Sequence, residues 1–268
     1  MIYFLTLLKY KLSLSEKEDE MEFKDYKKLS LANDIVILTA ADKPEDDKRK
    51  VPEKTLQILL IKRYEEPYNE FWSLPGGFVD HDKNLDDCAR EKLYAKTGIK
   101  NLYMEQLYTY GDTNRDERGR VVSVAYLALV KKSDINIQIS QKTDSSSASW
   151  FSIEPIRKAD EIVDVSLISE DGHLIVKDLA FDHKQMIIDA LNRLQNKIEY
   201  TDLAFNLVPE FFTVKELQMV YECILGRAIQ AFRRKISDKI KPADKMKDDG
   251  SAYRPAQLYR FDNKHSKF

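Results

Sequence analysis

The chain has 268 residues, of which 43% are hydrophobic and 33% are charged. This balance excludes a disordered chain and leaves room for one large domain or two of ordinary size. The net charge of −2 hides an asymmetry, because residues 227–268 hold 12 Lys and Arg against 5 Asp and Glu, a charge of +7, whereas the remainder carries −9. An acidic body with a basic C-terminal region is typical of a nucleic-acid-binding protein, although a solvated basic surface produces the same pattern.

The two cysteines and the N-terminus indicate a protein of the cytoplasm. Cys88 and Cys223 form no CxxC motif, and we interpret them as structural thiols in a reducing compartment. The apolar run within residues 1–20 is too short to span a membrane and lacks the cleavage site of a signal peptide. We therefore predict a cytoplasmic protein without a membrane segment, and we treat residues 1–30 as an N-terminal extension in which Met21 is an alternative start.

Strands dominate the first part of the chain. Residues 34–39 and 56–61 are apolar runs rich in β-branched residues, which predict two buried strands. The charged segment 43–54 between them contains prolines and predicts a solvated loop. A tight turn is predicted within residues 72–79, where Pro75 and two glycines interrupt a strand.

Helices alternate with strands in the next part. Residues 84–96 predict an amphipathic helix, because apolar residues recur every four positions between an N-cap at Asn84 and a C-cap at Gly98. Further strands are predicted at residues 103–110, 121–130 and 149–153, and a second amphipathic helix at residues 183–197. This order predicts an α/β sandwich, a mixed sheet with flanking helices.

The pattern after residue 200 is mostly helical. Thr213 and Glu216 form a capping box at the start of one helix, which we expect to end at Gly226. A basic helix is predicted at residues 227–240, and a strand that alternates basic and aromatic residues at 253–261. Helix, glycine turn, basic helix and basic strand are the parts of a winged helix-turn-helix.

Residues 34–155 resemble a Nudix domain, the fold of enzymes that hydrolyse nucleoside diphosphates linked to another group. The Nudix signature is a Gly, five residues, a Glu, seven residues, and then Arg-Glu-hydrophobic-x-Glu-Glu-x-Gly-hydrophobic. Its acids lie on successive turns of one helix face, within reach of the same Mg²⁺ ions, which bridge the diphosphate and help to generate the attacking hydroxide.

Most of the acids of this signature are missing here. When the chain is aligned on Gly77 and Gly98, the box positions are occupied by Lys83, Glu91, Lys92, Ala95 and Lys96. A register shifted by one residue recovers Asp82 but also loses the Glu-Glu pair. Both registers therefore predict no catalytic residues, no bound metal and no cofactor, and the lysines of the first register would repel a divalent cation.

The remainder of the Nudix-like pocket retains residues that can hold a phosphate or a sugar through charge-assisted hydrogen bonds and stacking. Taken singly, each arginine among them is more often a surface residue than a ligand contact. The predicted ligand-binding residues are Arg63, Trp72, Gly76, Gly77, Phe78, Arg115, Arg118 and Arg120.

The chain from about residue 30 resembles the Nudix-related transcriptional regulators. The shared segments are residues 103–110, 115–118, 179–183 and 253–259, together with Phe212, Thr213 and Gly226. In that family an often inactive Nudix domain senses a metabolite, and a winged helix binds DNA as a dimer. The resemblance implies an effector-sensing domain at residues 31–200 and a winged-helix DNA-binding domain at residues 201–268. It also implies a homodimer, a double-stranded operator, and an effector that is ADP-ribose or a related NAD metabolite, or else a pentose.

Some DNA contacts can be assigned on the predicted basic helix. Gln230 and Arg234 are four residues apart and share a helical face, so we predict that they contact base edges. Phosphate contacts are predicted for Arg233, Lys235, Arg254 and Arg260. Because the family usually has an Asn-Phe-Arg-like core here and this chain has Ala231 before Phe232, the operator sequence stays open.

Two other functions remain open at this point. One is a Nudix hydrolase of the ADP-ribose type, whose C-terminal domain serves dimerisation or covers the substrate. The missing Glu-Glu pair disfavours this alternative. The other is a ligand-binding module that has no DNA target.

Overall fold

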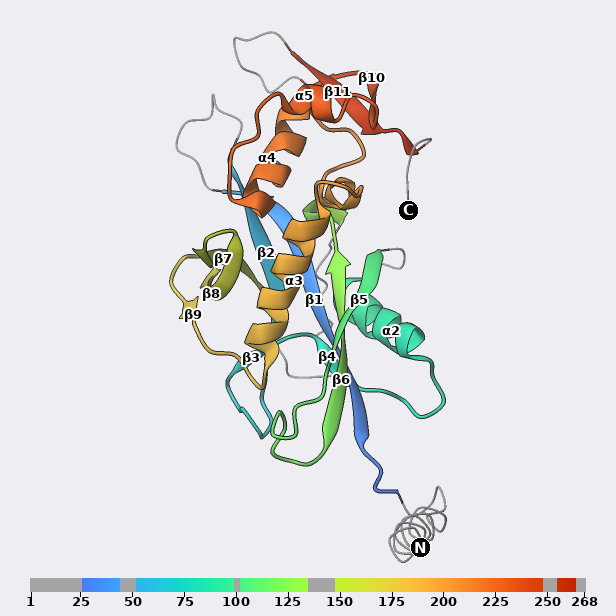
Figure 1. The fold of residues 1–268 in the computed structure, drawn as a ribbon, viewed down its shortest axis with the longest axis vertical. Helices are drawn as coiled ribbons and strands as arrows, with labels where there is room; N and C mark the ends of the chain where they lie inside the picture. The colour runs from blue at the N-terminus through green and yellow to red at the C-terminus, as the bar shows by residue number, and fades with distance from the viewer. Residues whose placement is uncertain (1–25, 44–51, 99–101, 135–147, 248–254, 264–268) are drawn as a thin grey trace, which may run out of the picture.

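The computed structural model describes residues 26–43, 52–98, 102–134, 148–247 and 255–263 (Figure 1). Most of the predicted N-terminal extension, residues 44–51 of the predicted loop, and Arg254 lie outside the described residues. In the part of the chain that is described, no helix is both long and apolar enough to cross a lipid bilayer.

A mixed sheet forms the centre of the first part, with the strand order β5-β6-β1-β2-β7-β8-β9. The strands β1 and β6 run parallel, whereas the other neighbours are antiparallel. The short strand β3 pairs with β2, and β4 pairs with β1. The strands are β1 (Ser30–Asp42), β2 (Lys54–Lys62), β3 (Trp72–Ser73), β4 (Gly76–Phe78), β5 (Tyr103–Tyr110), β6 (Val121–Leu129), β7 (Ala148–Lys158), β8 (Glu161–Ser169) and β9 (Ile175–Val176).

Helices cover both faces of this sheet, as a doubly buried central strand requires. Ile35 and Ile37 of β1 pack on one side with α2 (Leu85–Thr97). Val36 and Leu38 face the other side, where α3 (His183–Lys197) crosses the sheet (Figure 1). The predicted α/β sandwich with a mixed sheet and flanking helices is confirmed.

The second part of the chain lies at the opposite end of the molecule from β3 and β4 (Figure 1). It follows α3 in the chain and comprises η3 (Leu203–Leu207), α4 (Val214–Leu225), α5 (Phe232–Lys235), β10 (Ile240–Lys247) and β11 (Ala256–Phe261). The short helix η2 (Lys132–Asp134) belongs to the first part, between β6 and β7. The predicted capping box of Thr213 and Glu216 opens α4, and Gly226, at a φ of 68°, ends it. The antiparallel pair β10–β11 forms the wing, so the predicted winged helix is confirmed.

The basic helix predicted at residues 227–240 is wrong in its extent. Only the four residues of α5 are helical, and β10 begins at Ile240. Ala231 adopts a left-handed conformation, with φ 51° and ψ 34°, and this interrupts the α-helical hydrogen-bond ladder. Ile229 and Ile236 are nevertheless buried, so a turn and a short helix satisfy the apolar spacing that had predicted one long helix.

One hydrophobic core runs through both parts of the chain. It extends from Val36 in β1 through Leu194 in α3 to Leu217 in α4. Arg157 of β7 also reaches across, because its guanidinium donates a hydrogen bond of 3.2 Å to the carbonyl oxygen of Ile224. The domain boundary that we place between residues 200 and 201 stays a prediction. The core is continuous across that boundary.

Candidate functional site

A cavity of about 310 Å³ opens beside β1, between β4, the segment after β2, the loop before β6 and the start of α3. The strand β4 lies very close to β1 at this point. A Cβ atom on Gly76 would lie 2.4 Å from the carbonyl oxygen of Asn33 and 2.4 Å from Oδ1 of Asp34. Glycine is therefore required where the wall of the cavity meets its floor.

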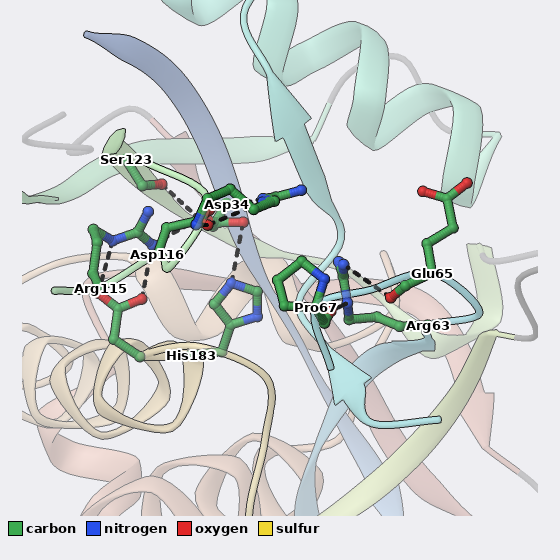
Figure 2. A network of polar contacts seen from close by, with 10 residues as sticks. Asp34, Arg63, Glu65, Pro67, Arg115, Asp116, Ser123 and His183 are labelled. Carbon is green, nitrogen blue, oxygen red and sulfur yellow. Dashed lines mark hydrogen bonds and ion pairs between the residues drawn. The ribbon is translucent and has the colours of Figure 1, made fainter. Parts of the chain in front are cut away.

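The floor of the cavity is a buried polar network around Asp34 (Figure 2). Ser123 donates a hydrogen bond of 2.6 Å to Oδ2 of Asp34. Nε2 of His183 lies 3.4 Å from Oδ1, and a guanidinium nitrogen of Arg115 lies 3.6 Å from Oδ2. Burial disfavours the charged carboxylate, but His183, Ser123 and Arg115 outweigh this effect and lower the pKa of Asp34.

Arg115 links the loop before β6 to the start of α3. Its guanidinium donates two hydrogen bonds to the carboxylate of Asp182, at 2.9 and 2.7 Å. The side chain is almost fully buried, with 4% of its surface exposed. Because bidentate pairs of this kind are strong and directional, Arg115 shapes the cavity from below rather than offering a charge at its mouth.

The imidazole of His183 connects the floor of the cavity to the turn before β4. Nδ1 accepts a hydrogen bond of 2.9 Å from the backbone N–H of Leu74. Nδ1 therefore acts as an acceptor in this arrangement, and Nε2 faces Asp34. The first residue of α3 thus fixes both the floor and the wall of the cavity.

Aromatic rings and guanidinium groups alternate around the mouth. The guanidinium carbon of Arg63 lies 5.0 Å from the centroid of the Phe181 ring, and that of Arg118 lies 5.5 Å from both Phe181 and Phe78. Burial and the charge of Arg118 lower the pKa of Arg63. An anion placed between the two guanidinium groups would relieve this repulsion.

The arginines at the mouth differ in how far their charges are compensated. Arg118 forms a bidentate pair with Asp116, whose pKa it lowers, with hydrogen bonds of 2.9 and 2.7 Å. Arg63 donates to the carbonyl oxygens of Pro67 and Glu65, at 3.0 and 3.4 Å, which carry no net charge (Figure 2). Arg63 is therefore the cation best suited to bind an anionic group of a ligand.

The structure brings six of the eight predicted ligand-binding residues together. Trp72 lies outside the cavity lining, and its ring packs against Phe151 in the core with a centroid distance of 4.8 Å. Arg120 also lies outside, where it donates hydrogen bonds of 2.8 and 2.9 Å to the carbonyl oxygens of Gly111 and Asp112. The six that line the cavity are Arg63, Gly76, Gly77, Phe78, Arg115 and Arg118.

The altered Nudix box lies on and beside α2. Lys83 binds two carboxylates, since its ammonium lies 2.8 Å from Oδ2 of Asp80 and 2.5 Å from Oε2 of Glu91. Ala95 is exposed, and the side chain of Lys96 lies outside the described part of the structure. Glu91, an acid that remains at a box position, and the nearby Asp80 thus already bind a cation that belongs to the chain itself.

Lys92 occupies the other part of the box. Its ammonium donates hydrogen bonds of 2.6 Å to the carbonyl oxygens of both Gly77 and Phe78. Among the described residues, no group of three or more His, Cys, Asp or Glu could hold a metal ion. The divalent cation that a Nudix fold implies therefore does not fit these residues, because lysines occupy the oxygen atoms that would bind it.

The winged helix places the predicted DNA-binding residues differently from expectation. Gln230 lies in the turn before α5 and Arg234 lies within it, so the two do not share a helical face as predicted. Arg233 donates a hydrogen bond of 2.8 Å to the hydroxyl of Tyr259 and packs over its ring, which ties α5 to the wing.

Exposed cations nevertheless cluster on this part of the chain. Arg234, Lys235 and Arg260 are exposed, and among the described residues none of the three has an ion-pair partner. Lys241 and Lys247 of β10, by contrast, pair with Asp262 and Glu216. The strand β10 was not predicted, so these lysines were missed as parts of the wing.

Sequence analysis also missed the floor of the cavity and one ring at its mouth. Asp34 is predicted as the start of a strand, and His183 as the start of a helix, without a role in the site. Phe181, Asp182 and His183 belong to the segment 179–183 that the resemblance had singled out. This shared segment was the signal that could have found them.

The comparisons with known proteins match both parts of the chain. A family model described as the NUDIX domain matches residues 46–169, and one described as the NrtR DNA-binding winged helix domain matches residues 204–261. The ADPR responsive transcriptional repressor NtrR of Acinetobacter baylyi is 41% identical over 217 residues, which cover 79% of this chain and 78% of that protein. This chain belongs to the NrtR family of Nudix-related transcriptional regulators.

Solved structures agree with this assignment. The crystal structure of Shewanella oneidensis NrtR complexed with a 27mer DNA has a TM-score of 0.64 and 33% sequence identity, and it covers 87% of this chain and 93% of that chain. The ADP-ribose pyrophosphatase of Methanocaldococcus jannaschii is 28% identical over 137 residues, or 51% of this chain and 67% of that enzyme. The likeness to members of the NrtR family thus extends through both parts, whereas this match to an enzyme covers about half of the chain.

Proposed function

We propose that this chain is a transcriptional repressor whose Nudix domain binds ADP-ribose and whose winged helix binds operator DNA. The observation that carries the proposal is that one continuous core joins a cavity rimmed by guanidinium groups to a winged helix whose exposed Arg234, Lys235 and Arg260 have no ion-pair partner among the described residues. The Acinetobacter baylyi relative is a repressor that responds to ADP-ribose, which favours this effector over a pentose.

The mouth of the cavity suits the parts of such a ligand. A diphosphate carries negative charge that Arg63 and Arg118 can bind, and the backbone of Gly76 and Gly77 offers a close approach. The Phe181 ring can stack on an adenine, which has a planar apolar face. The volume of about 310 Å³ lies within the usual range for small-molecule sites.

The winged helix supplies the DNA contacts in this proposal. Arg234, Lys235 and Arg260 are all exposed and therefore available to DNA. Arg234 contacts base edges in this proposal, and Lys235 and Arg260 contact phosphates. Gln230 and Arg254 stay predicted contacts, and Arg233 acts by holding α5 against the wing. We further propose that the protein acts in the cytoplasm as a homodimer on a two-fold symmetric operator, with half-sites about one helical turn apart.

A DNA-binding titration tests this function. Fluorescence anisotropy compares duplex DNA from upstream of the protein's own gene with a random duplex of equal length, with and without ADP-ribose. We expect tighter binding to the upstream DNA and release of that DNA by ADP-ribose. Arg234→Ala should lose about 1–3 kcal/mol of binding free energy and loosen sequence preference, whereas Lys177→Ala, an exposed change outside the winged helix, should not.

Two results would contradict the proposal separately. Equal affinity of the wild type for upstream and random DNA would show that the chain is not a sequence-specific regulator. Specific DNA binding that ADP-ribose leaves unchanged would retain the regulator and remove ADP-ribose as its effector.

The hydrolase alternative has one comparison in its favour, the Methanocaldococcus jannaschii pyrophosphatase. The positions of Lys83 and Lys92 oppose it, because they occupy the oxygen atoms that a divalent cation requires. With Mg²⁺ or Mn²⁺ we expect no release of AMP from ADP-ribose above background. Clear metal-dependent release would establish the enzyme instead.

A further inference from the structure

Lys92 is placed as a bound cation would be. Two of the three N–H groups of its ammonium donate to the carbonyl oxygens of Gly77 and Phe78, each at 2.6 Å. Both of these residues line the sensing cavity. The ammonium is thus held by two residues of the cavity wall, while Lys92 itself is not among the lining residues, and within the described residues its third N–H group has no acceptor.

The surroundings of Lys92 fix it in this position. Gly77 has a φ of 150°, which L side chains rarely adopt, and a Cβ atom there would be in ordinary contact with the lysine nitrogen, at 3.6 Å. Lys92 sits on α2, whose residues Ala89 and Leu93 pack into the core below β1. Because the apolar face of α2 is packed into the core, the helix holds Lys92 at a fixed position beside the cavity wall.

Lys83, a second lysine at a position of the altered box, also lies where a cation could bind, but its partners are carboxylates. Its ammonium is held by Asp80 and Glu91, at 2.8 and 2.5 Å. These contacts raise the pKa of Lys83 and lower that of Asp80, so both groups are charged at neutral pH. Two ammonium groups thus occupy the carbonyl and carboxylate oxygens that a hard divalent cation would need.

We propose that Lys92 replaces the divalent cation of the Nudix fold and, together with Arg63 and Arg118, binds the effector's diphosphate directly, so that ligand binding needs no metal. The third N–H group of its ammonium donates to a phosphate oxygen at the cavity wall. Lys83 neutralises the neighbouring carboxylates, which would otherwise repel the diphosphate. This inference rests on the proposed function, because it takes a diphosphate such as ADP-ribose as the ligand.

Calorimetric titration of the full chain with ADP-ribose tests the inference, in EDTA and in excess Mg²⁺. Wild-type protein should bind with the same affinity in both conditions. Lys92→Gln keeps a donor for the loop carbonyls but removes the charge, so it should bind about tenfold more weakly in both. Lys92→Arg should retain near wild-type affinity, and Lys177→Gln serves as a control that removes an exposed charge elsewhere.

Lys92→Glu separates a role in ligand binding from a merely structural one. A carboxylate at this position, close to the carbonyl oxygens of Gly77 and Phe78, supplies oxygen ligands for a divalent cation. We expect this variant to bind ADP-ribose poorly in EDTA and several times more tightly when Mg²⁺ is added. A general loosening of the loop would weaken binding without creating any dependence on metal.

The outcomes separate the role of Lys92 from the identity of ADP-ribose as the effector. If wild-type affinity collapses in EDTA, or if Lys92→Gln binds ADP-ribose as tightly as wild type, the inference is overturned while ADP-ribose remains the effector. If ADP-ribose binds in neither condition, the proposed effector itself is overturned, and the inference with it.

Discussion

Asp34 and His183 lie 149 positions apart in the chain but hold one cavity together. Asp34 accepts a hydrogen bond from Ser123 and faces the guanidinium of Arg115. His183 faces Asp34 and accepts a hydrogen bond from the backbone N–H of Leu74. Each buried polar group of this network has a partner, which is the condition under which such groups cost little. The floor can therefore stay rigid while the mouth above it accepts a charged ligand.

Asp34→Asn tests the floor. The change should lower the free energy of unfolding at pH 7 by about 2 kcal/mol, because an amide no longer balances the buried charge of Arg115. The pKa of Asp34 is lowered in the folded state, so the carboxylate stabilises the fold above the unfolded pKa of about 4 and loses this effect as the pH falls through the lower, folded pKa. Urea unfolding from pH 7 to pH 3 should show the wild type and the variant converging below about pH 4.

The control for this prediction is Asp42→Asn at the other end of β1. Asp42 is mostly exposed and pairs with Lys54 at 2.6 Å, so its loss should change stability by less than about 0.5 kcal/mol at every pH. A difference between wild type and Asp34→Asn that stays constant down to pH 3 would contradict the ionised state of Asp34.

Single residues show where prediction from the sequence stops. The lysines of the altered box were found because a known spacing gives each position a chemical role. Asp34 belongs to no known motif, and one acid at the start of a strand does not reveal which distant residues it will contact. Lys92 shows a similar gap: its position disfavoured a metal, but its contacts with two carbonyl oxygens arise only from the folded loop.

At the scale of elements, the end of α4 joins the winged helix to the sheet. Gly226 ends the helix in a left-handed conformation, and its N–H group donates to the carbonyl oxygen of Glu222 at 2.8 Å. Arg157 of β7 lies against this glycine and also binds Gln195 of α3. One guanidinium thus contacts an element from each side of the predicted domain boundary.

Gly226→Ala measures this junction. A left-handed alanine costs about 1 kcal/mol in any context, and a Cβ atom here would also lie 2.7 Å from Nε of Arg157 and displace it. We expect a loss of about 2 kcal/mol in urea unfolding. Gly98→Ala is the matched control, because Gly98 ends α2 at a φ of 72° and no described heavy atom lies within 4 Å of its Cβ position, so about 1 kcal/mol should be lost. Equal losses in the two variants would show that Arg157 does not constrain α4.

Elements were predictable wherever one periodicity extended without interruption. The helix at residues 183–197 was predicted with its observed bounds, and the strand at 103–110 likewise. The predicted helix at 227–240 failed because the left-handed Ala231 leaves the apolar spacing intact and is invisible in the sequence. The strand β10 was missed because it has few apolar residues and contains Pro242.

At the scale of the whole molecule, one core serves both the sensing and the DNA-binding parts. The sequence allowed both parts to be predicted, because each has its own motifs. It could not show that Leu194 of α3 and Leu217 of α4 pack into the same cluster, since this depends on how the two parts dock. We therefore expect a single cooperative unit, although the chain has the length of two domains.

Unfolding with two local probes checks this cooperativity. Trp72 and Trp150 report on the sheet, and Cys223 reports on α4 through its reaction with a thiol reagent in a Cys88→Ala background. Burial raises the pKa of Cys223 to about 11, so it should react slowly until α4 unfolds. Both probes should give the same urea midpoint, and ADP-ribose at ten times its Kd should stabilise both by about 1.4 kcal/mol. Labelling of Cys223 at a lower urea concentration than the tryptophan change would show that the winged helix unfolds separately.

The helix α3 starts in the floor of the cavity, at His183, and ends beside the winged helix, at Lys197. Its 15 residues include neither proline nor glycine, and they span about 22 Å. We expect this helix to move as a rigid body, because its first residue, His183, is held by Asp34 and Leu74. A rotation of about 5° about that end, which an arriving diphosphate could impose with a shift of a few tenths of an ångström, carries the other end through about 2 Å. A displacement of this size at the winged helix would change how it meets the groove of an operator.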